Sequence, residues 1–228
     1  MSPKLPGRGK GTVNPTISIV NRSRTISDAE IRRKLPALQK QISRHFEPVW
    51  GWGANLRFNS KRFDMKVIIK DRSRGGDLGY HIEGHKPVAT IFAQDDIDAA
   101  QEYTSTLSHE LLEMIADPYV NLYATGPFQL HRRKRIGFYA FEVCDPVQEN
   151  YYKIDGVRVQ DFVFPEWFEQ DRKRGSMKMD HMGTVDAPFM LAEGGYLDVL
   201  SKSRWHSLVG PKAERSRKRH RLIVRKEA

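Results

Sequence analysis

Apolar side chains recur at helical spacing near the start of the chain. The residues that share this spacing are Ile31, Leu35, Leu38, Ile42 and Phe46. Intervals of three and four residues place them on one face of a helix. The preceding stretch 27–30, Ser-Asp-Ala-Glu, has the form of a capping box at a helix N-terminus. We therefore predict a helix that begins after Ser27, with Pro36 bending or interrupting it.

Three segments that follow have the β-branched and aromatic character of strands: 49–58, 63–71 and 87–94. A long helix is then expected from Asp95 or Asp96 to Pro118. Beyond it the pattern is irregular, apart from a hairpin whose turn is Asp155-Gly156. A helix, several strands, a helix and a loop-rich end predict an α+β fold rather than alternating βαβ units.

The composition is that of one globular domain between basic ends. The chain has 228 residues, of which 39% are hydrophobic and 10% aromatic, and a net charge of +10 that lies mainly at the two ends. We predict a flexible basic arm over 1–24, a single domain over 25–205 and a disordered basic tail over 206–228.

The tail has two interpretations. Arginine and lysine clusters bind nucleic acid or another polyanion by releasing counterions, but they also occur in tails that only aid solubility. The residues that would contact a nucleic acid are Arg215, Arg217, Lys218, Arg219 and Arg221.

Three features predict a cytoplasmic protein with no membrane partner. No apolar run approaches the length that spans a bilayer, and the basic N-terminus precedes no apolar signal segment. Cys144 is the single cysteine, which favours a reducing compartment.

The segment 108–118, SHELLEMIADP, carries the candidate chemistry. At 100° per residue, Glu113 lies within about 40° of His109, and apolar residues of the same helix fall on the opposite side. Such a pair, four residues apart, can bind one metal ion, and Glu110 is placed to act as a general base. The ion would be zinc or another divalent metal, since a carboxylate in the second position favours harder ions. The alternative is the polar face of an ordinary amphipathic helix.

A second acidic segment, FEVCDPV, could complete such a site. Glu142 could be a third ligand, and Asp145 could accept the imidazole N–H of His109 and fix its tautomer. Cys144 is either a soft ligand or a small buried side chain that points away. The alternative for the segment is a surface loop with two acids.

Other residues are weaker candidates. His81 and His85 could line a cleft or bind the ion, although loop histidines are usually exposed. Tyr123, Tyr139 and Tyr151 could stabilise an oxyanion, although aromatic packing is the commoner role.

The segment SHELLEMIADP followed by FEVCDP resembles zincin metallopeptidases of the gluzincin kind. In these enzymes one helix supplies His-Glu-x-x-His and a later Glu completes the metal site. The His-Glu-x-x-Glu variant, with Asp-Pro and a downstream Glu-x-x-Asp, is also similar to a pattern in uncharacterised bacterial and phage proteins and in the plant exordium (phosphate-induced) family.

The resemblance implies a zincin-like fold and a role for each residue of the motif. His109, Glu113 and Glu142 match metal ligands, Glu110 matches the general base that activates a water molecule at the ion, and Asp117 lies at the end of the motif. The implied activity is that of a zinc peptidase acting on a peptide or protein, which the strand at 87–94 would bind along an open sheet edge. The alternatives are an inactive binding protein with this fold, and a nucleic-acid- or phage-associated protein that acts through its basic tails.

Overall fold

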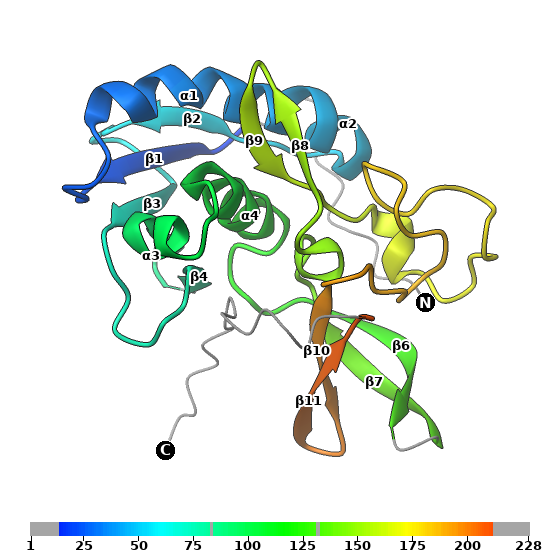
Figure 1. The fold of residues 1–228 in the computed structure, drawn as a ribbon. Helices are drawn as coiled ribbons and strands as arrows, with labels where there is room; N and C mark the ends of the chain where they lie inside the picture. The colour runs from blue at the N-terminus through cyan, green and yellow to red at the C-terminus, as the bar shows by residue number, and fades with distance from the viewer. Residues whose placement is uncertain (1–13, 83, 131–132, 212–228) are drawn as a thin grey trace.

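The computed structural model describes residues 14–82, 84–130 and 133–211 (Figure 1). They form an α+β fold, as the order of elements predicted, with helices beside a mixed five-stranded sheet and two smaller antiparallel sheets. The candidate nucleic-acid residues of the tail lie outside the described residues. Among the described residues, no helix is both long and apolar enough to cross a membrane.

The main sheet has the strand order β2-β1-β3-β5-β4. Its strands are β1 (Thr16–Asn21), β2 (Asn55–Phe58), β3 (Met65–Lys70), β4 (Gly79–Ile82) and β5 (Val88–Phe92). All neighbouring strands are parallel except β4, which is antiparallel to β5 and forms one edge. Alternate side chains of β1 and β3 enter the core, because successive residues of a strand point to opposite faces.

Three predictions about strands and termini were wrong. The arm 1–24 contains β1, where Ile17 and Ile19 are fully buried in the middle of the sheet. The strand predicted at 49–58 is limited to β2, because Val49 and Trp50 belong to a helix. The first residues of the tail predicted over 206–228 belong to strand β11 (Arg204–Val209).

The first helix is the predicted one. α1 (Asp28–Lys40) begins after Ser27, whose hydroxyl accepts a hydrogen bond of 3.1 Å from the backbone N–H of Glu30. The helix continues through Pro36 and passes through a π-helical turn, η1 (Gln41–Phe46), into α2 (Glu47–Trp50). It packs on the main sheet through Ile31 and Leu38, which are almost fully buried.

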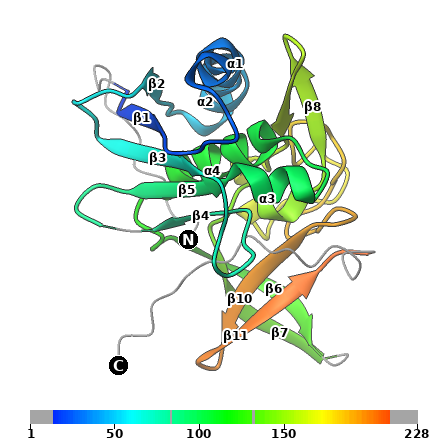
Figure 2. The same ribbon diagram turned by 60° about the vertical axis from the view of Figure 1, so that its left-hand side comes forward.

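The long helix predicted from Asp95 is two helices, α3 (Ala93–Asp98) and α4 (Tyr103–Ala116). They separate at Ala100, which adopts a left-handed conformation with φ of 57°. Asp96 then accepts a 2.5 Å hydrogen bond from Thr106 in the first turn of α4. Figure 2 shows α4 and α1 beside the main sheet, and every residue of α4 is buried.

The C-terminal half contains two antiparallel sheets. β6 (Tyr123–Leu130), β7 (Arg133–Ala140), β10 (Tyr196–Ser201) and β11 form a sheet of order β11-β10-β7-β6. β8 (Tyr151–Ile154) and β9 (Val157–Gln160) form the predicted hairpin, with Asp155 and Gly156 at positive φ in its turn. Two 3-10 turns, η2 (Asp145–Val147) and η3 (Pro165–Phe168), lie in the connecting segments.

Candidate metal centre

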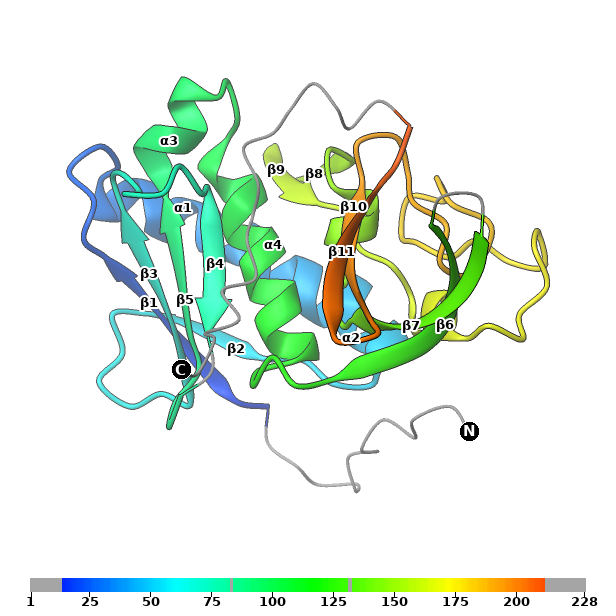
Figure 3. The same ribbon diagram turned by 90° about the horizontal axis from the view of Figure 1, so that it is seen from below.

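Three segments that are distant in the sequence meet at the centre of the molecule. α4 lies between the main sheet and the β6-β7-β10-β11 sheet (Figure 3). It contributes His109, Glu110 and Glu113. The edge strand β4 contributes His81 on one side, and the segment that follows β7 contributes Glu142 on the other.

The polar face of α4 is not a solvent-exposed face. His109, Glu110 and Glu113 are as deeply buried as the apolar residues on the opposite side of the helix. The exposed acid at this end of α4 is Glu102, the N-cap residue, which lies outside the helix. Because buried ionisable groups are unfavourable unless they are paired or bind metal, this burial argues against an ordinary amphipathic helix.

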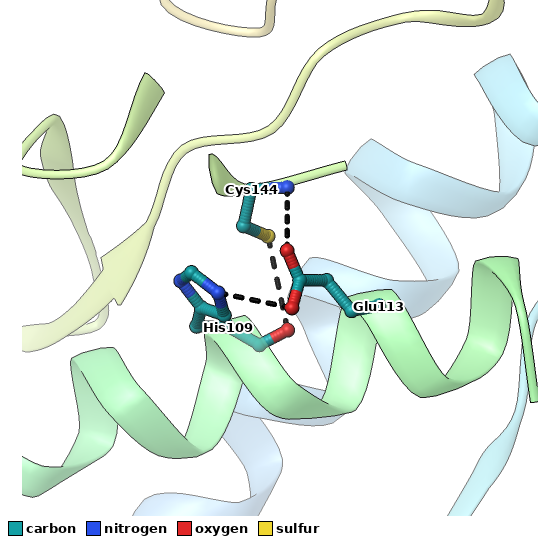
Figure 4. Close-up of side chains that lie close together, drawn as sticks. All are labelled: His109, Glu113 and Cys144. Carbon is teal, nitrogen blue, oxygen red and sulfur yellow. Dashed lines mark hydrogen bonds and ion pairs between the residues drawn. The ribbon is translucent and has the colours of Figure 1, made fainter. Parts of the chain in front are cut away.

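His109 contacts two carboxylates. Its Nε2 atom lies 3.0 Å from Oε2 of Glu113 and 3.2 Å from Oδ1 of Asp145. The backbone N–H of Cys144 donates a 3.1 Å hydrogen bond to Oε1 of Glu113, and the Cys144 sulfur lies 3.8 Å from the carbonyl oxygen of His109 (Figure 4). Asp145 therefore adjoins His109 at the same ring nitrogen as Glu113, and Cys144 is buried within the centre rather than pointing away from it.

Two groups of buried side chains could hold a metal ion. One is His109, Glu113 and Cys144, and the other is His81, Glu113 and Glu142; within each group the ligand atoms lie within 4.8 Å of one another. The three predicted ligands all belong to these groups, with Glu113 in both, whereas His109 and Glu142 fall in different groups.

His81 was underestimated because the sequence placed it in a loop. It belongs to β4 and pairs in register with Ala89 of β5, so its side chain lies on the buried face of the main sheet. Its Nδ1 atom lies 3.5 Å from Oε2 of Glu110. In β4 the buried Gly79 and His81 alternate with the more exposed Tyr80 and Ile82. This two-residue alternation is the signal that could have identified the strand. His85 is exposed.

The centre has an excess of acid. Five buried carboxylates surround the two histidines: Glu110, Glu113, Asp117, Glu142 and Asp145. Burial, together with neighbouring negative charge, raises the pKa of Glu113 and of Glu142 well above the usual value. Among the described residues, no lysine or arginine pairs with Glu113, Glu142 or Asp145. The two histidines are therefore the side chains placed to offset these charges.

The negative charge of these carboxylates raises the pKa of both histidines. Burial alone would lower the pKa of His81, but the charges of Glu142 and Glu110 outweigh burial and raise it to about 9. The pKa of His109 is raised in the same way, against burial, by Asp145 and then Glu110. The imidazole Nε2 of His81 and Oε2 of Glu142 have no hydrogen-bond partner in the described chain. These buried nitrogen and oxygen donors fit a divalent cation.

The remaining predicted residues lie at the periphery or elsewhere. Asp117 follows the last turn of α4 and accepts a 2.8 Å hydrogen bond from the backbone N–H of Leu122. Tyr123 is exposed, and the hydroxyl of Tyr139 donates to the carbonyl of Pro127 at 2.6 Å. The hydroxyl of Tyr151 lies 3.5 Å from the side chain of Gln101.

The tyrosine at the centre is Tyr196 of β10, which was not among the oxyanion candidates. Burial and the charges of Asp145 and Glu113 raise its pKa well above the usual value, and its side chain hydrogen-bonds Asp145. Its position depends on the pairing of β10 with β7, which links segments about sixty residues apart and leaves no local pattern.

The strand predicted to bind a peptide is not at an edge. β5, within 87–94, lies between β3 and β4, and β4 is the edge strand next to α4. Strand β4 was not predicted, because it has only four residues and follows a short, glycine-rich segment.

Comparison of the chain with models of known protein families, with curated proteins and with solved structures finds no match. What the centre can do is therefore inferred from its own residues.

Replacing Glu142 with Gln should have opposite effects in the metal-free and zinc-loaded protein. Without metal, the substitution removes a carboxylate that burial and Glu113 disfavour, so the melting temperature at pH 8 should rise. About 1 kcal/mol corresponds to ~2–4 °C in a domain of this size. With zinc, the wild type should gain more than the variant, because ligand binding stabilises the folded state.

Differential scanning calorimetry after chelation, with and without added zinc, measures both effects. Glu102→Gln is the matched control, since Glu102 is exposed and lies at the start of the same helix. If zinc raises the melting temperature of the wild type and of Glu142→Gln equally, Glu142 is not a ligand of the metal.

Proposed function

We propose that the protein is a metal-dependent, peptidase-like hydrolase with a zincin-like active centre, and that zinc is its metal. The observation that carries the proposal is the burial of His109, Glu110 and Glu113 on one helix, beside a second histidine and further carboxylates. This face lies beside β4, an edge strand that is antiparallel to β5.

The proposed ligands are His109, Glu113 and Glu142. Cys144 lies within reach of the first two, and His81 lies within reach of the last two. Zinc accepts imidazole nitrogen, carboxylate oxygen and thiolate sulfur. When bound, it acts as a Lewis acid that polarises a carbonyl group and lowers the pKa of water.

Glu110 is the general base. Its carboxylate adjoins the metal-binding atoms, because Glu110 follows His109 directly and faces His81 at 3.5 Å. Gly79 of β4 leaves the space that this carboxylate occupies: a Cβ atom there would lie 2.7 Å from Oε1 of Glu110. Glu110 would accept the proton of the attacking water and deliver it to the leaving amine.

Asp145 and Tyr196 position His109. Asp145 lies 3.2 Å from Nε2 of His109, and Tyr196 hydrogen-bonds Asp145. Because the pKa of Tyr196 is raised, its phenol stays protonated at neutral pH and donates this hydrogen bond. Because Asp145 faces the same Nε2 atom as Glu113, the two carboxylates hold the imidazole between them.

The edge strand β4 supports a peptide substrate. One side of β4 pairs with β5, and no strand of the described chain pairs with its other side. An extended peptide could add to such an edge through its backbone, next to Glu110 and His81. This assigns to β4 the role that the sequence suggested for the neighbouring strand.

Replacing Glu110 with Gln tests the catalytic assignment. The amide keeps the size of the side chain but accepts no proton, so hydrolysis should fall by about 10²–10⁴-fold while zinc content is unchanged. Cleavage of a mixed peptide library, followed by mass spectrometry, measures activity, and elemental analysis measures zinc. His109→Ala should lose both, and Glu102→Gln neither. Full activity of zinc-loaded Glu110→Gln would refute the role of Glu110.

A second candidate function, single-stranded nucleic-acid binding, is supported by the outer face of the β6-β7-β10-β11 sheet. Ile136 and Phe138 of β7 are 58% and 53% exposed. Across the sheet, Phe138 pairs with Leu200, and Leu200 pairs with Trp205, whose ring lies 6.0 Å from that of Tyr123. Exposed aromatic side chains on a sheet are a stacking platform for unpaired bases.

Basic residues surround this face. They line an open pocket of about 480 Å³ that contains no acidic residue, and its lining is Arg133, Lys134, Arg135, Ile136, Phe138, Leu200, Ser201 and Lys202. Positive charge beside exposed aromatic rings matches the phosphates and bases of a single strand better than it matches an apolar partner.

Binding of a fluorescein-labelled oligothymidylate, followed by fluorescence anisotropy, tests this surface. Phe138→Ala should weaken binding by about 5–100-fold, the loss of one stacked base. The double variant Arg133→Ala, Lys134→Ala should show a shallower slope of log K against log salt concentration, by about 0.7 for each cation removed. Lys153→Ala, an exposed lysine on β8, is the control. Unchanged binding in all variants, with loss on deletion of 212–228, would assign nucleic-acid binding to the tail instead.

A further inference from the structure

Glu113 belongs to both groups of candidate ligands. Its Oε2 atom lies 3.0 Å from Nε2 of His109, and its Oε1 atom accepts the hydrogen bond from the backbone of Cys144. A carboxylate can give one oxygen to each of two cations, and two-metal sites have the ions about 3.5–4 Å apart. We propose that the centre holds two divalent cations bridged by Glu113. This inference rests on the proposed metal-dependent function.

The first site is formed by His109, Glu113 and Cys144, with Asp145 beside them. The Nε2 atom of His109 lies 3.0 Å from Glu113 and 3.2 Å from Asp145. Bonds of about 2.0–2.1 Å in a tetrahedral zinc site separate ligand atoms by about 3.4 Å, which is close to both distances. The thiol of Cys144 selects zinc or another soft ion at this site.

The second site is formed by His81, Glu113 and Glu142. His81 is 7% exposed and Glu142 is 4% exposed, and each presents a buried atom without a hydrogen-bond partner in the described chain: Nε2 of His81 and Oε2 of Glu142. Buried polar atoms are almost always satisfied, so unpartnered atoms of this kind in one cluster indicate a ligand. His81 belongs to β4, whereas Glu142 lies two residues before Cys144 in the segment that follows β7.

The charge of the centre also favours more than one divalent cation. If all five buried carboxylates are ionised, one divalent ion leaves three negative charges unbalanced, and two ions leave one. A buried charge without a counter-charge is unfavourable, because removing an ion from water costs several kcal/mol. A second cation beside His81 and Glu142 would neutralise part of the charge that a single cation leaves.

The two sites would differ in role. Glu110 is 3.5 Å from His81, so the His81 site lies next to the general base and next to the open edge of β4. The Cys144 site includes His109, which faces Asp145, and Tyr196 hydrogen-bonds Asp145. Glu110 would therefore act beside the ion at the His81 site, and Glu113 would link that ion to the one held by His109 and Cys144.

Zinc stoichiometry of the full chain tests this directly. Protein purified without an affinity tag, stripped with chelator and dialysed against zinc, is analysed by inductively coupled plasma mass spectrometry. The wild type should bind about two equivalents, His81→Asn and Cys144→Ser about one each, and Glu113→Gln less than one. Glu102→Gln should match the wild type, and circular dichroism reports whether each variant is folded.

Cobalt absorption gives a second readout that does not depend on stoichiometry. A thiolate bound to Co²⁺ produces a charge-transfer band, which should appear in the wild type and in His81→Asn and be absent in Cys144→Ser. One equivalent of zinc in the wild type, or no thiolate band with cobalt, would overturn the two-metal centre and leave the metal-dependent function standing. No zinc in the wild type would overturn both.

Discussion

The constraint on which the centre depends is the burial of acidic side chains around α4. Glu110 and Glu113 lie on a helix that exposes no residue, and Glu142, Asp145 and Asp117 approach the same space from the segments that follow. Like charges at short range in a poorly solvated interior repel strongly, as the raised pKa of Glu113 shows, where burial is the larger cause and Asp145 the next. Only protons or cations can relieve this repulsion, and the two histidines are placed to share metal ions with the acids.

The rest of the fold positions these groups. The left-handed Ala100 separates α3 from α4 and lets α4 begin at Tyr103, directed along the buried face of the main sheet. Gly79 allows β4 to approach Glu110, and the antiparallel direction of β4 places His81 beside it. β7 and β10 then hold the opposite side, with Cys144 and Asp145 directly after β7 and Tyr196 at the start of β10.

The sequence could predict what depends on local spacing. His109, Glu110 and Glu113 lie within five residues of one helix, and the hairpin turn at Asp155-Gly156 is likewise a property of two adjacent residues. It could not predict what depends on strand pairing between distant segments. His81 enters the centre because β4 pairs antiparallel with β5, and Tyr196 because β10 pairs with β7. The break between α3 and α4 was missed because alanine favours helix, and the tertiary contact of Asp96 with Thr106 overrides that preference.

The most direct test of the account is X-ray diffraction from crystals of the zinc-soaked protein, measured on both sides of the zinc absorption edge. The account predicts anomalous density between His81, His109, Glu113 and Glu142, within about 2.0–2.3 Å of their nitrogen and oxygen atoms. Well-ordered side chains at these positions with no anomalous density among them would contradict the claim that the buried cluster is a metal centre.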